Sequence, residues 1–233
     1  SQMKLLIVLA MLAARAASVQ DLSGKTFTFP VNLTSNLMNT HFLSDCHRPH
    51  NKPVCRICRS FTDIRRDHSL FSMSTSGFPN SFLIFWDETH KEMAAYIMGK
   101  RSDFRGLDYK PNMWHSICTT WDSATGLVQL WFNGRPTIRL YAPTSSAITG
   151  TPMIILGQEQ DSHGGGFDSD QAFVGMMSDV HMWDYVLSSC EIKSYVDELS
   201  FTPGNVLNWK ALKFHITDKV LVEPKSVVSK ISC

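Results

Sequence analysis

The stretch "GLVQLWFNGRPTIRLY", residues 126–141, carries the pattern that decides the fold. Two runs in it alternate apolar with polar residues, as expected of strands that bury one face. The dipeptide Asn133-Gly134 lies between them and favours positive φ at both turn positions, which the tightest β-hairpin turn requires. The stretch therefore predicts two antiparallel strands joined by a two-residue turn.

Working outward from this hairpin, most of the chain has the same all-β character. "TFTFPV" (26–31) alternates, and "SFLIFW" (81–86) is a short, aromatic, apolar run. Turn residues recur throughout, and there is no internal repeat or low-complexity linker. We therefore predict one domain, built as an all-β sandwich of two antiparallel sheets.

One helix is predicted in "LSSCEIKSYVDEL", residues 187–199. Ser188 is followed three residues later by Glu191, which is the pattern of a capping box. The apolar residues that follow have helical spacing, which indicates a short helix laid on one face of a sheet; they are Ile192, Tyr195, Val196 and Leu199.

The composition supports a globular, extracellular protein. Of 233 residues, 43% are apolar and 18% charged, which is enough for a real core. The net charge is +1 without a basic block, which disfavours nucleic acid as a specific partner. Met3-Lys4 precedes a short apolar run, and Ala14 and Ala16 have the spacing of a signal-peptidase site.

We read residues 1–17 as a secretory signal and 18–233 as the single mature domain. The apolar run is too short for a membrane span, and no later run is long enough. Secretion implies disulfides rather than free thiols, although six cysteines supplement a core of this size and do not replace it. The sequon Asn32-Leu33-Thr34 is a candidate glycosylation site. The cysteines are Cys46, Cys55, Cys58, Cys118, Cys190 and Cys233.

An acidic loop, "ILGQEQDSHGGGFDSDQ" (155–171), follows an apolar strand-like run. Calcium is bound by six to eight oxygens, many of them from carboxylates and amides, and the loop offers this mixture. A solvated acidic turn is the alternative. The three glycines suit a loop that folds back tightly, and no Gly-Lys-Ser/Thr follows them as in a phosphate-binding loop. Its oxygen-bearing residues are Glu159, Gln160, Asp161, Asp168, Asp170 and Gln171.

Three other kinds of site are less well supported. A zinc site would use closely spaced Cys and His residues, but no second ligand pair follows, and residues three apart on a strand face opposite ways. The same geometry separates His115 from Cys118 as a nucleophile pair. The third is a glycosidase site, in which two carboxylates flank opposite faces of a sugar. Glu159 and Asp161 lie too close along one loop for this and are better suited to binding a shared metal ion. The zinc candidates are Cys46, His47, His50, Cys55 and Cys58.

Four motifs resemble those of the pentraxin family, and its C-reactive protein-like members in particular: "SICTTWDS" (116–123), "IILGQEQDS" (154–162), "MWDYVLS" (182–188) and "NVLNWKALK" (205–213). The resemblance runs from about Thr26 to the 210s and leaves out residues 35–53, which we treat as a loop. It implies a lectin-like jelly roll with one helix on one face and two calcium ions on the other. It also implies a secreted homopentamer that recognises phosphocholine or polysaccharide in innate immunity and acts with complement.

Carried over position by position, the resemblance implies a ligand set for the two ions. Glu159 and Asp161 would bridge them, and Gln160 would offer its backbone carbonyl to the first. Asp168 and Gln171 would complete the second ion. Asn80 would bind the first, but Pro79 stands where the family has an aspartate, so we expect this site to be weakened.

The resemblance also assigns a ligand pocket and a disulfide. Phe85 would form the apolar wall for choline, Ile97 would replace a threonine of the pocket, and Ser102 or Asp103 would lie near the position of a glutamate. Cys55 and Cys118 would form the intrachain disulfide, leaving the pairing of the other four cysteines open.

Two alternatives remain at this point. A laminin-G-like or legume-lectin-like sugar-binding sandwich shares the architecture but lacks the "ILGQEQDS" and "MWDYVLS" pair. An extracellular jelly-roll polysaccharide hydrolase is less favoured, because Glu159 and Asp161 are too close along one loop to flank the two faces of a sugar. We predict a binding protein, not an enzyme, with its tryptophans in packing roles.

Overall fold

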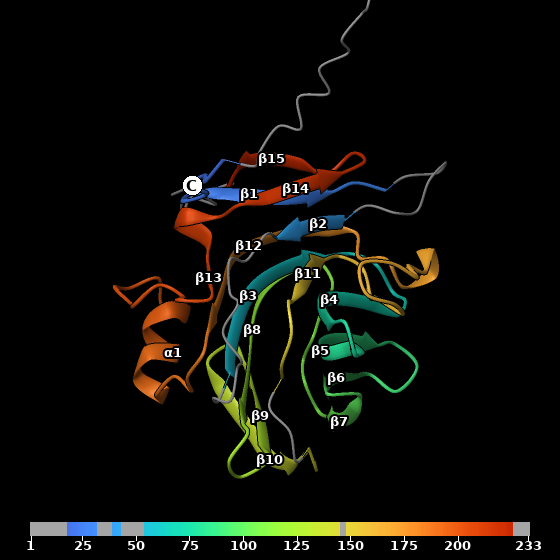
Figure 1. The fold of residues 1–233 in the computed structure, drawn as a ribbon. Helices are drawn as coiled ribbons and strands as arrows, with labels where there is room; N and C mark the ends of the chain where they lie inside the picture. Colours follow the sequence, from blue (N-terminus) through green and yellow to red (C-terminus); the bar gives the residue numbers. More distant parts are fainter. Residues whose placement is uncertain (1–17, 32–38, 43–53, 145–147, 226–233) are drawn as a thin grey trace, which may run out of the picture.

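Two antiparallel β-sheets face each other across one core (Figure 1). The computed structural model describes residues 18–31, 39–42, 54–144 and 148–225. The first sheet, called here the helix-bearing sheet, has the strand order β10-β9-β8-β3-β12-β1-β15, and β13 pairs with β12. Its strands are β1 (Lys25–Phe29), β3 (Val54–Thr62), β8 (Met113–Asp122), β9 (Leu127–Phe132), β10 (Arg135–Tyr141), β12 (Gly175–Trp183), β13 (Leu207–Asn208) and β15 (Leu221–Pro224).

The second sheet, called here the loop-bearing sheet, has the order β14-β2-β11-β4-β5-β6-β7. The predicted fold class, an all-β jelly-roll sandwich with one short helix on one face, is confirmed. No helix in the described part of the chain has the length and apolar content needed to cross a bilayer. The strands are β2 (Asn39–Phe42), β4 (His68–Thr75), β5 (Phe78–Asp87), β6 (Glu92–Ile97), β7 (Lys100–Phe104), β11 (Met153–Leu156) and β14 (Phe214–Thr217).

The predicted hairpin at 126–141 is confirmed as β9 and β10. Asn133 has φ of 50° and Gly134 has φ of 77°, so both turn residues are left-handed as the dipeptide indicated. By contrast, part of the segment interpreted as a loop forms strand β2, which pairs with β11 and β14. Its alternation was too short to detect in the sequence.

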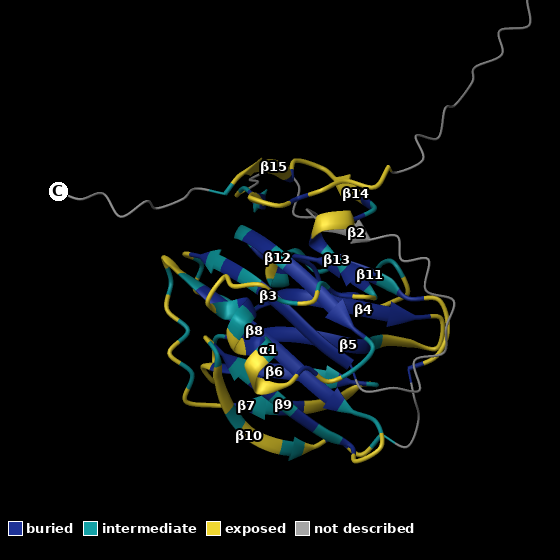
Figure 2. Ribbon diagram, turned by 90° about the vertical axis from the view of Figure 1, so that its left-hand side faces the viewer, coloured by how far each residue is buried: buried dark blue, intermediate teal, exposed yellow. Residues whose placement is uncertain are grey.

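The strands at the centre of the molecule are buried on both faces (Figure 2). On β3, Val54 and Cys58 point into the core between the sheets, while Cys55 and Ile57 point the other way, beneath α1 (Ser189–Val196). This alternation follows from the pleat of a strand. It also places Cys55 and Cys58 on opposite faces, so they cannot serve as paired zinc ligands.

Helix α1 has the predicted capping box. The Ser188 side chain accepts from the Glu191 backbone N–H, and the Glu191 carboxylate accepts from the Ser188 N–H at 2.9 Å. Ile192 and Tyr195 pack onto the helix-bearing sheet. Leu199 was predicted to share this face, but the helix ends at Val196 and Leu199 is exposed.

The tryptophans pack as predicted. Four of them are almost completely buried, and Trp114 and Trp131 are half-buried at the edges of the core. His115 stacks on Phe132, at a centroid distance of 4.9 Å, while Cys118 lies in the cluster under α1, so the two are not a catalytic pair. The four buried tryptophans are Trp86, Trp121, Trp183 and Trp209.

Cys55 and Cys118 meet across the neighbouring strands β3 and β8. Their sulfur atoms lie 3.5 Å apart as thiols in this structure, in the buried cluster under α1. We propose that they form the disulfide expected from the sequence. A disulfide between these cysteines, which are 63 positions apart in the sequence, would stabilise the fold by roughly 4 kcal/mol in the chain-entropy model. Cys46, Cys233, the Asn32 sequon and the signal segment 1–17 lie outside the described residues.

Three buried histidines make the fold sensitive to acid: His68, His181 and His115, whose pKa is also lowered by burial. A ring nitrogen of His68 lies 2.8 Å from the Arg66 carbonyl, and His181 Nδ1 accepts from the Gly204 N–H at 3.3 Å. Burial lowers the pKa of both side chains to about 4, because a buried imidazolium loses its hydration.

We predict that the free energy of unfolding falls as the pH is lowered from about 6.5 to about 4, because the unfolded chain binds these protons first. His68 and His181 should each contribute about 3 kcal/mol to this loss, and His115 should add to it. Urea unfolding across this range, with a chelator present, measures it. His181→Phe should remove about 3 kcal/mol of this loss, and His215→Asn, at an exposed position, should leave the loss unchanged. An unaltered pH profile in His181→Phe would contradict this assignment.

Candidate metal centre

The acidic loop after β11 is folded back on itself on the outer side of the loop-bearing sheet. Ser162 and Gly165 exchange backbone hydrogen bonds, and the Phe173 N–H donates to the Gly157 carbonyl at 2.9 Å, which closes the loop. Gly166 has φ of 71°, and a Cβ there would lie 2.8 Å from the Cβ of Asp161. The glycine run is therefore needed for this close return of the backbone.

Gln160 fastens the loop to the sheet. Its side-chain oxygen accepts from Ser74 Oγ at 2.7 Å and from the Gly164 N–H at 3.0 Å. Its amide nitrogen donates to Ser72 Oγ and to the Met153 carbonyl, both at 3.1 Å. The side chain is thus fully engaged in structural contacts, which leaves the backbone carbonyl as the group that Gln160 can offer to a metal.

Glu159 and Asn80 bring the loop and the start of β5 together. Asn80 Nδ2 donates to Glu159 Oε1 at 3.0 Å, while Asn80 Oδ1 is buried without a hydrogen-bond partner in the described part of the chain. Burial raises the pKa of Glu159, the bond from Asn80 lowers it, and the charges of Asp161 and Asp168 raise it further. An oxygen with no donor beside repelling carboxylates is an arrangement that a cation would stabilise.

Asp168 and Gln171 lie in one turn at the end of the loop. Asp168 caps the 3-10 helix η1 (Ser169–Gln171), and its Oδ1 accepts from the Asp170 N–H at 2.9 Å. Asp161 and Asp170 are exposed. The structure therefore brings Asp161 and Asp168 into the electrostatic surroundings of Glu159 and keeps Gln171 beside Asp168.

Pro79 and Ser81 flank Asn80 and add no ligand. Pro79 has no polar side chain, and the buried Ser81 hydroxyl donates to the Phe78 carbonyl at 2.9 Å and lies 2.8 Å from Thr75 Oγ1. Ser81 therefore does not replace the missing carboxylate. Compared with the ligand set that the resemblance implies, the surroundings of Asn80 lack one carboxylate.

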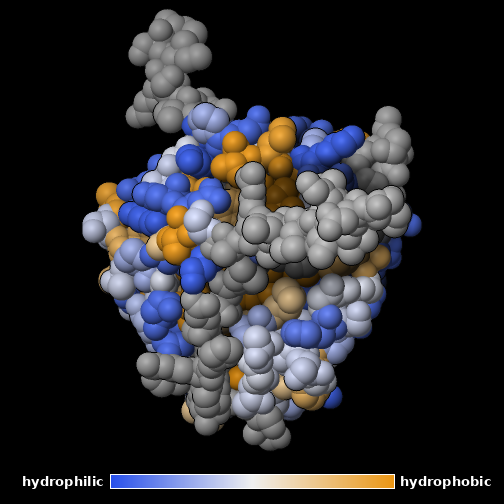
Figure 3. All heavy atoms as spheres, turned by 45° about the horizontal axis from the view of Figure 1, so that its top comes forward, coloured by the Kyte–Doolittle hydropathy of each residue, from blue (hydrophilic) through white to orange (hydrophobic). Residues whose placement is uncertain are grey.

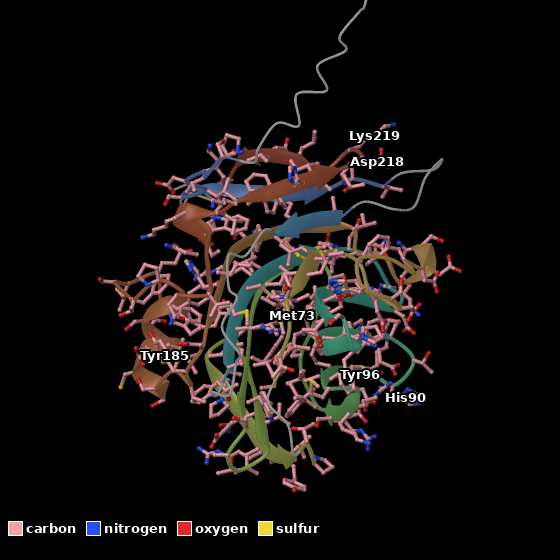
Figure 4. The ribbon with its side chains drawn as sticks, in the orientation of Figure 1. Met73, His90, Tyr96, Tyr185, Asp218 and Lys219 are labelled. Atoms are coloured by element: carbon pink, nitrogen blue, oxygen red, sulfur yellow. The ribbon has the colours of Figure 1, made fainter. Side chains whose placement is uncertain are left out.

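A second acidic group lies on the β5–β6 turn and at the neighbouring strand ends. Ligand atoms of Asp87, His90 and Glu92 lie within 4.8 Å of one another, closer than the loop carboxylates converge (His90 is labelled in Figure 4). However, Arg101 Nη2 donates to Asp87 at 2.8 Å and to Glu92 at 2.9 Å, and Arg105 donates to Glu92 at 2.6 Å. Guanidinium groups already neutralise these carboxylates, so we assign this cluster to an ion-pair network.

Phe85 lies on the outer face of the loop-bearing sheet, as the ligand-wall prediction requires. It is 7% exposed and packs with Leu83, Ala94 and the half-buried Tyr96. Tyr96, labelled in Figure 4, is the cross-strand partner of Leu83. Tyr96 was not predicted from the sequence as part of this aromatic surface. The alternation of "EMAAYI" carries the signal, but the partner strand was needed to locate it.

Asp103 is the polar residue in register with Phe85. Phe85 pairs with Ala94, and Ala94 pairs with Asp103 on β7. Asp103 Oδ1 accepts from Arg101 Nε at 2.5 Å, so its charge is compensated. The expectation that Ile97 shapes the pocket was wrong, since Ile97 lies in the core between the sheets. Ser102, which pairs with Ala95, is buried on that side as well.

Comparisons with known proteins identify relatives of this chain. A model of the Pentaxin family matches residues 25–224. "Female protein" of Nothocricetulus migratorius is 36% identical over 97% of this chain and 95% of its own length. Serum amyloid P-component of Sus scrofa is 35% identical over 95% and 98% respectively, and C-reactive protein of Xenopus laevis is 36% identical over 91% and 88%.

The fold has a solved counterpart. The native heptameric SAP-like pentraxin of Limulus polyphemus superposes with a TM-score of 0.78 at 21% identity, covering 90% of this chain and 99% of that one.

Proposed function

The chain belongs to the pentaxin family, and from this premise we propose that it is a secreted, calcium-dependent pattern-recognition protein of innate immunity. Members of this family are binding proteins and not enzymes, so the hydrolase alternative is set aside. The proposal keeps residues 1–17 as a secretory signal and 18–233 as one domain. Relatives named as serum components support secretion.

Calcium binding is carried by one observation, the buried and unpartnered Oδ1 of Asn80 beside Glu159. We assign Glu159 and Asp161 as ligands shared by two ions, with Asn80 and the Gln160 carbonyl on the first. Asp168 and Gln171 would complete the second. The first ion is the weaker one, because Pro79 supplies no carboxylate and the Ser81 hydroxyl is engaged elsewhere.

We predict that calcium raises the melting temperature, because it binds only the folded loop and relieves the repulsion among its carboxylates. Glu159→Gln should remove most of this rise, since it deletes a charge shared by both ions. Thermal scans with calcium and with a chelator measure the effect. Glu198→Gln, an exposed acid near α1, is the matched control and should keep the full rise. A wild-type melting temperature indifferent to calcium would refute the proposed site.

The proposed ligand carries a phosphate held by the calcium ions. A choline group would then lie along Phe85 and Tyr96, where an aromatic face and a free carboxylate would attract its charge. Asp103 is the carboxylate in register with Phe85 across the sheet, and the guanidinium of Arg101 already compensates its negative charge. We therefore propose phosphate-bearing or anionic polysaccharide ligands with little preference for choline. Complement as a partner rests on the family resemblance.

We predict that phosphoethanolamine elutes the protein from a phosphate-bearing matrix about as well as phosphocholine. Arg101→Gln should shift this balance toward phosphocholine, because it releases the Asp103 carboxylate. Lys193→Gln, which removes a cation that pairs with Asp197 on α1, is the control and should not. If phosphocholine is preferred by more than about tenfold in the wild type, a gap of roughly 1.4 kcal/mol, the choline pocket is intact and this interpretation is wrong.

Self-assembly into a ring is proposed from the two ends of the helix-bearing sheet. A closed ring needs two different, complementary patches on each subunit. The edge strand β10 exposes Ile138 (71%) and Tyr141 (68%), with Arg135 and Arg139 beside them. At the other end, the edge strand β15, the edge strand β14 of the loop-bearing sheet and the turn between them expose apolar side chains beside acidic ones (Figure 3 shows apolar beside hydrophilic residues here; Asp218 is labelled in Figure 4). These are Ile216, Leu221, Val222, Asp218 and Glu223.

We predict that the wild-type protein sediments as a closed oligomer and that Ile138→Lys dissociates it, because a charge then enters the apolar contact. Val186→Lys, at an equally apolar position near α1 that is 42% exposed, is the control and should leave assembly intact. Analytical ultracentrifugation gives both results and the ring size. The family resemblance favours five subunits, and a wild-type monomer would exclude a ring.

A further inference from the structure

Arg56 is a charged residue inside the core of the sandwich. It lies on the inward face of β3 and is only 3% exposed. Its guanidinium lies 3.5 Å from the ring centroid of Phe82 and 4.4 Å from that of Phe71. One nitrogen, Nη2, lies 3.3 Å from the sulfur of Met73, between the two sheets (Figure 4). Phe71 and Phe82 also contact each other, edge to face.

No carboxylate in the described part of the chain pairs with this guanidinium, and its Nε and Nη1 have no hydrogen-bond partner there. Two other arginines show the contrast: the half-buried Arg59 pairs with Glu198, and the more exposed Arg101 pairs with Asp87 and Glu92. Aromatic faces and a thioether offset part of the lost hydration of Arg56. An arginine stays protonated, so a buried guanidinium of this kind needs a compensating negative charge.

Two further buried polar groups lie on the same inward face. Thr119 is the direct cross-strand partner of Arg56 on β8, and its hydroxyl has no partner among the described residues. The indole N–H of Trp121 is equally unpartnered. Trp121 pairs with Val54, which places it diagonally across from Arg56, within the reach of neighbouring side chains. All of these groups can donate, and neither the guanidinium nor the indole can accept.

We infer that the interior of the sandwich binds a small monovalent anion, chloride in extracellular fluid, between Arg56 and the donors of Thr119 and Trp121. A cluster of donors around a buried positive charge selects an acceptor that carries negative charge; a water molecule would satisfy the hydrogen bonds and leave the charge uncompensated. This site is on the opposite side of the loop-bearing sheet from the acidic loop and is independent of calcium.

The test is thermal unfolding of the full-length, oxidised protein in a chelator, as chloride replaces the bulkier gluconate at constant ionic strength. Chloride in large excess over its dissociation constant should raise the melting temperature by roughly 5 °C. Arg56→Met, which fits among Phe71, Met73 and Phe82, should fold and lose this dependence. Thr119→Val keeps the shape of Thr119 and should weaken chloride binding about fivefold. Crystals grown in bromide should show an anomalous peak beside Arg56.

Two outcomes would overturn the inference. The first is a wild-type melting temperature that is equal in both salts, or a chloride response that survives in Arg56→Met. The second concerns Asp45, the one acidic side chain outside the described residues. Asp45→Asn should leave the chloride response unchanged; if it removes the response, Asp45 and not an ion supplies the negative charge.

Discussion

The structure depends on the burial of both faces of the β3–β8 strand pair. One face of this pair forms the core against the loop-bearing sheet, and the other lies beneath α1. Because side chains alternate along a strand, a substitution on β3 affects the packing of one face only. Cys55 and Ile57 pack beneath the helix, and Val54 and Cys58 pack against the second sheet. The helix and the acidic loop are thereby kept on opposite outer faces of one sandwich.

The loop can be acidic because a buried amide anchors it. Gln160 makes four hydrogen bonds to the sheet and to the loop itself, so the backbone is held even though Glu159, Asp161 and Asp168 repel one another. A rigid loop backbone of this kind can keep the carboxylates of Glu159, Asp161 and Asp168 close to one another even when no cation is bound between them. The proposed ligand preference is then set on the neighbouring strands β5, β6 and β7, where Arg101 and Asp103 determine the charge beside Phe85 and Tyr96.

Charge is handled in opposite ways on the two sides of the loop-bearing sheet. On the outer face, Arg101 joins three carboxylates in an ion-pair network, which lowers the pKa of Asp87 and Glu92. On the inner face, Arg56 has aromatic rings and a thioether for neighbours. A buried charge without an opposite charge is costly, so it survives in a core only where its retention brings an advantage or where a ligand offsets it.

The sequence alone determined the features that depend on neighbours along the chain. The Asn133-Gly134 turn, the Ser188–Glu191 capping box and the acid-rich loop are local, and local geometry follows from residues a few positions apart. The family motifs extended this to the sheet architecture. Strand β2 and the C-terminal end of α1 were not predicted correctly, because a short alternating run and a helix terminus are weak sequence signals.

Only the tertiary structure decided which distant side chains meet. The register of β5, β6 and β7 placed Asp103 in the row of Phe85, turned Ile97 inward and brought Tyr96 opposite Leu83. It also set Arg56 opposite Thr119 and left the guanidinium without a carboxylate in the described part of the chain. Cross-strand partners come from segments far apart in sequence, and a shift of one residue in register reverses the face of every side chain, so their meeting is a property of the folded sheets.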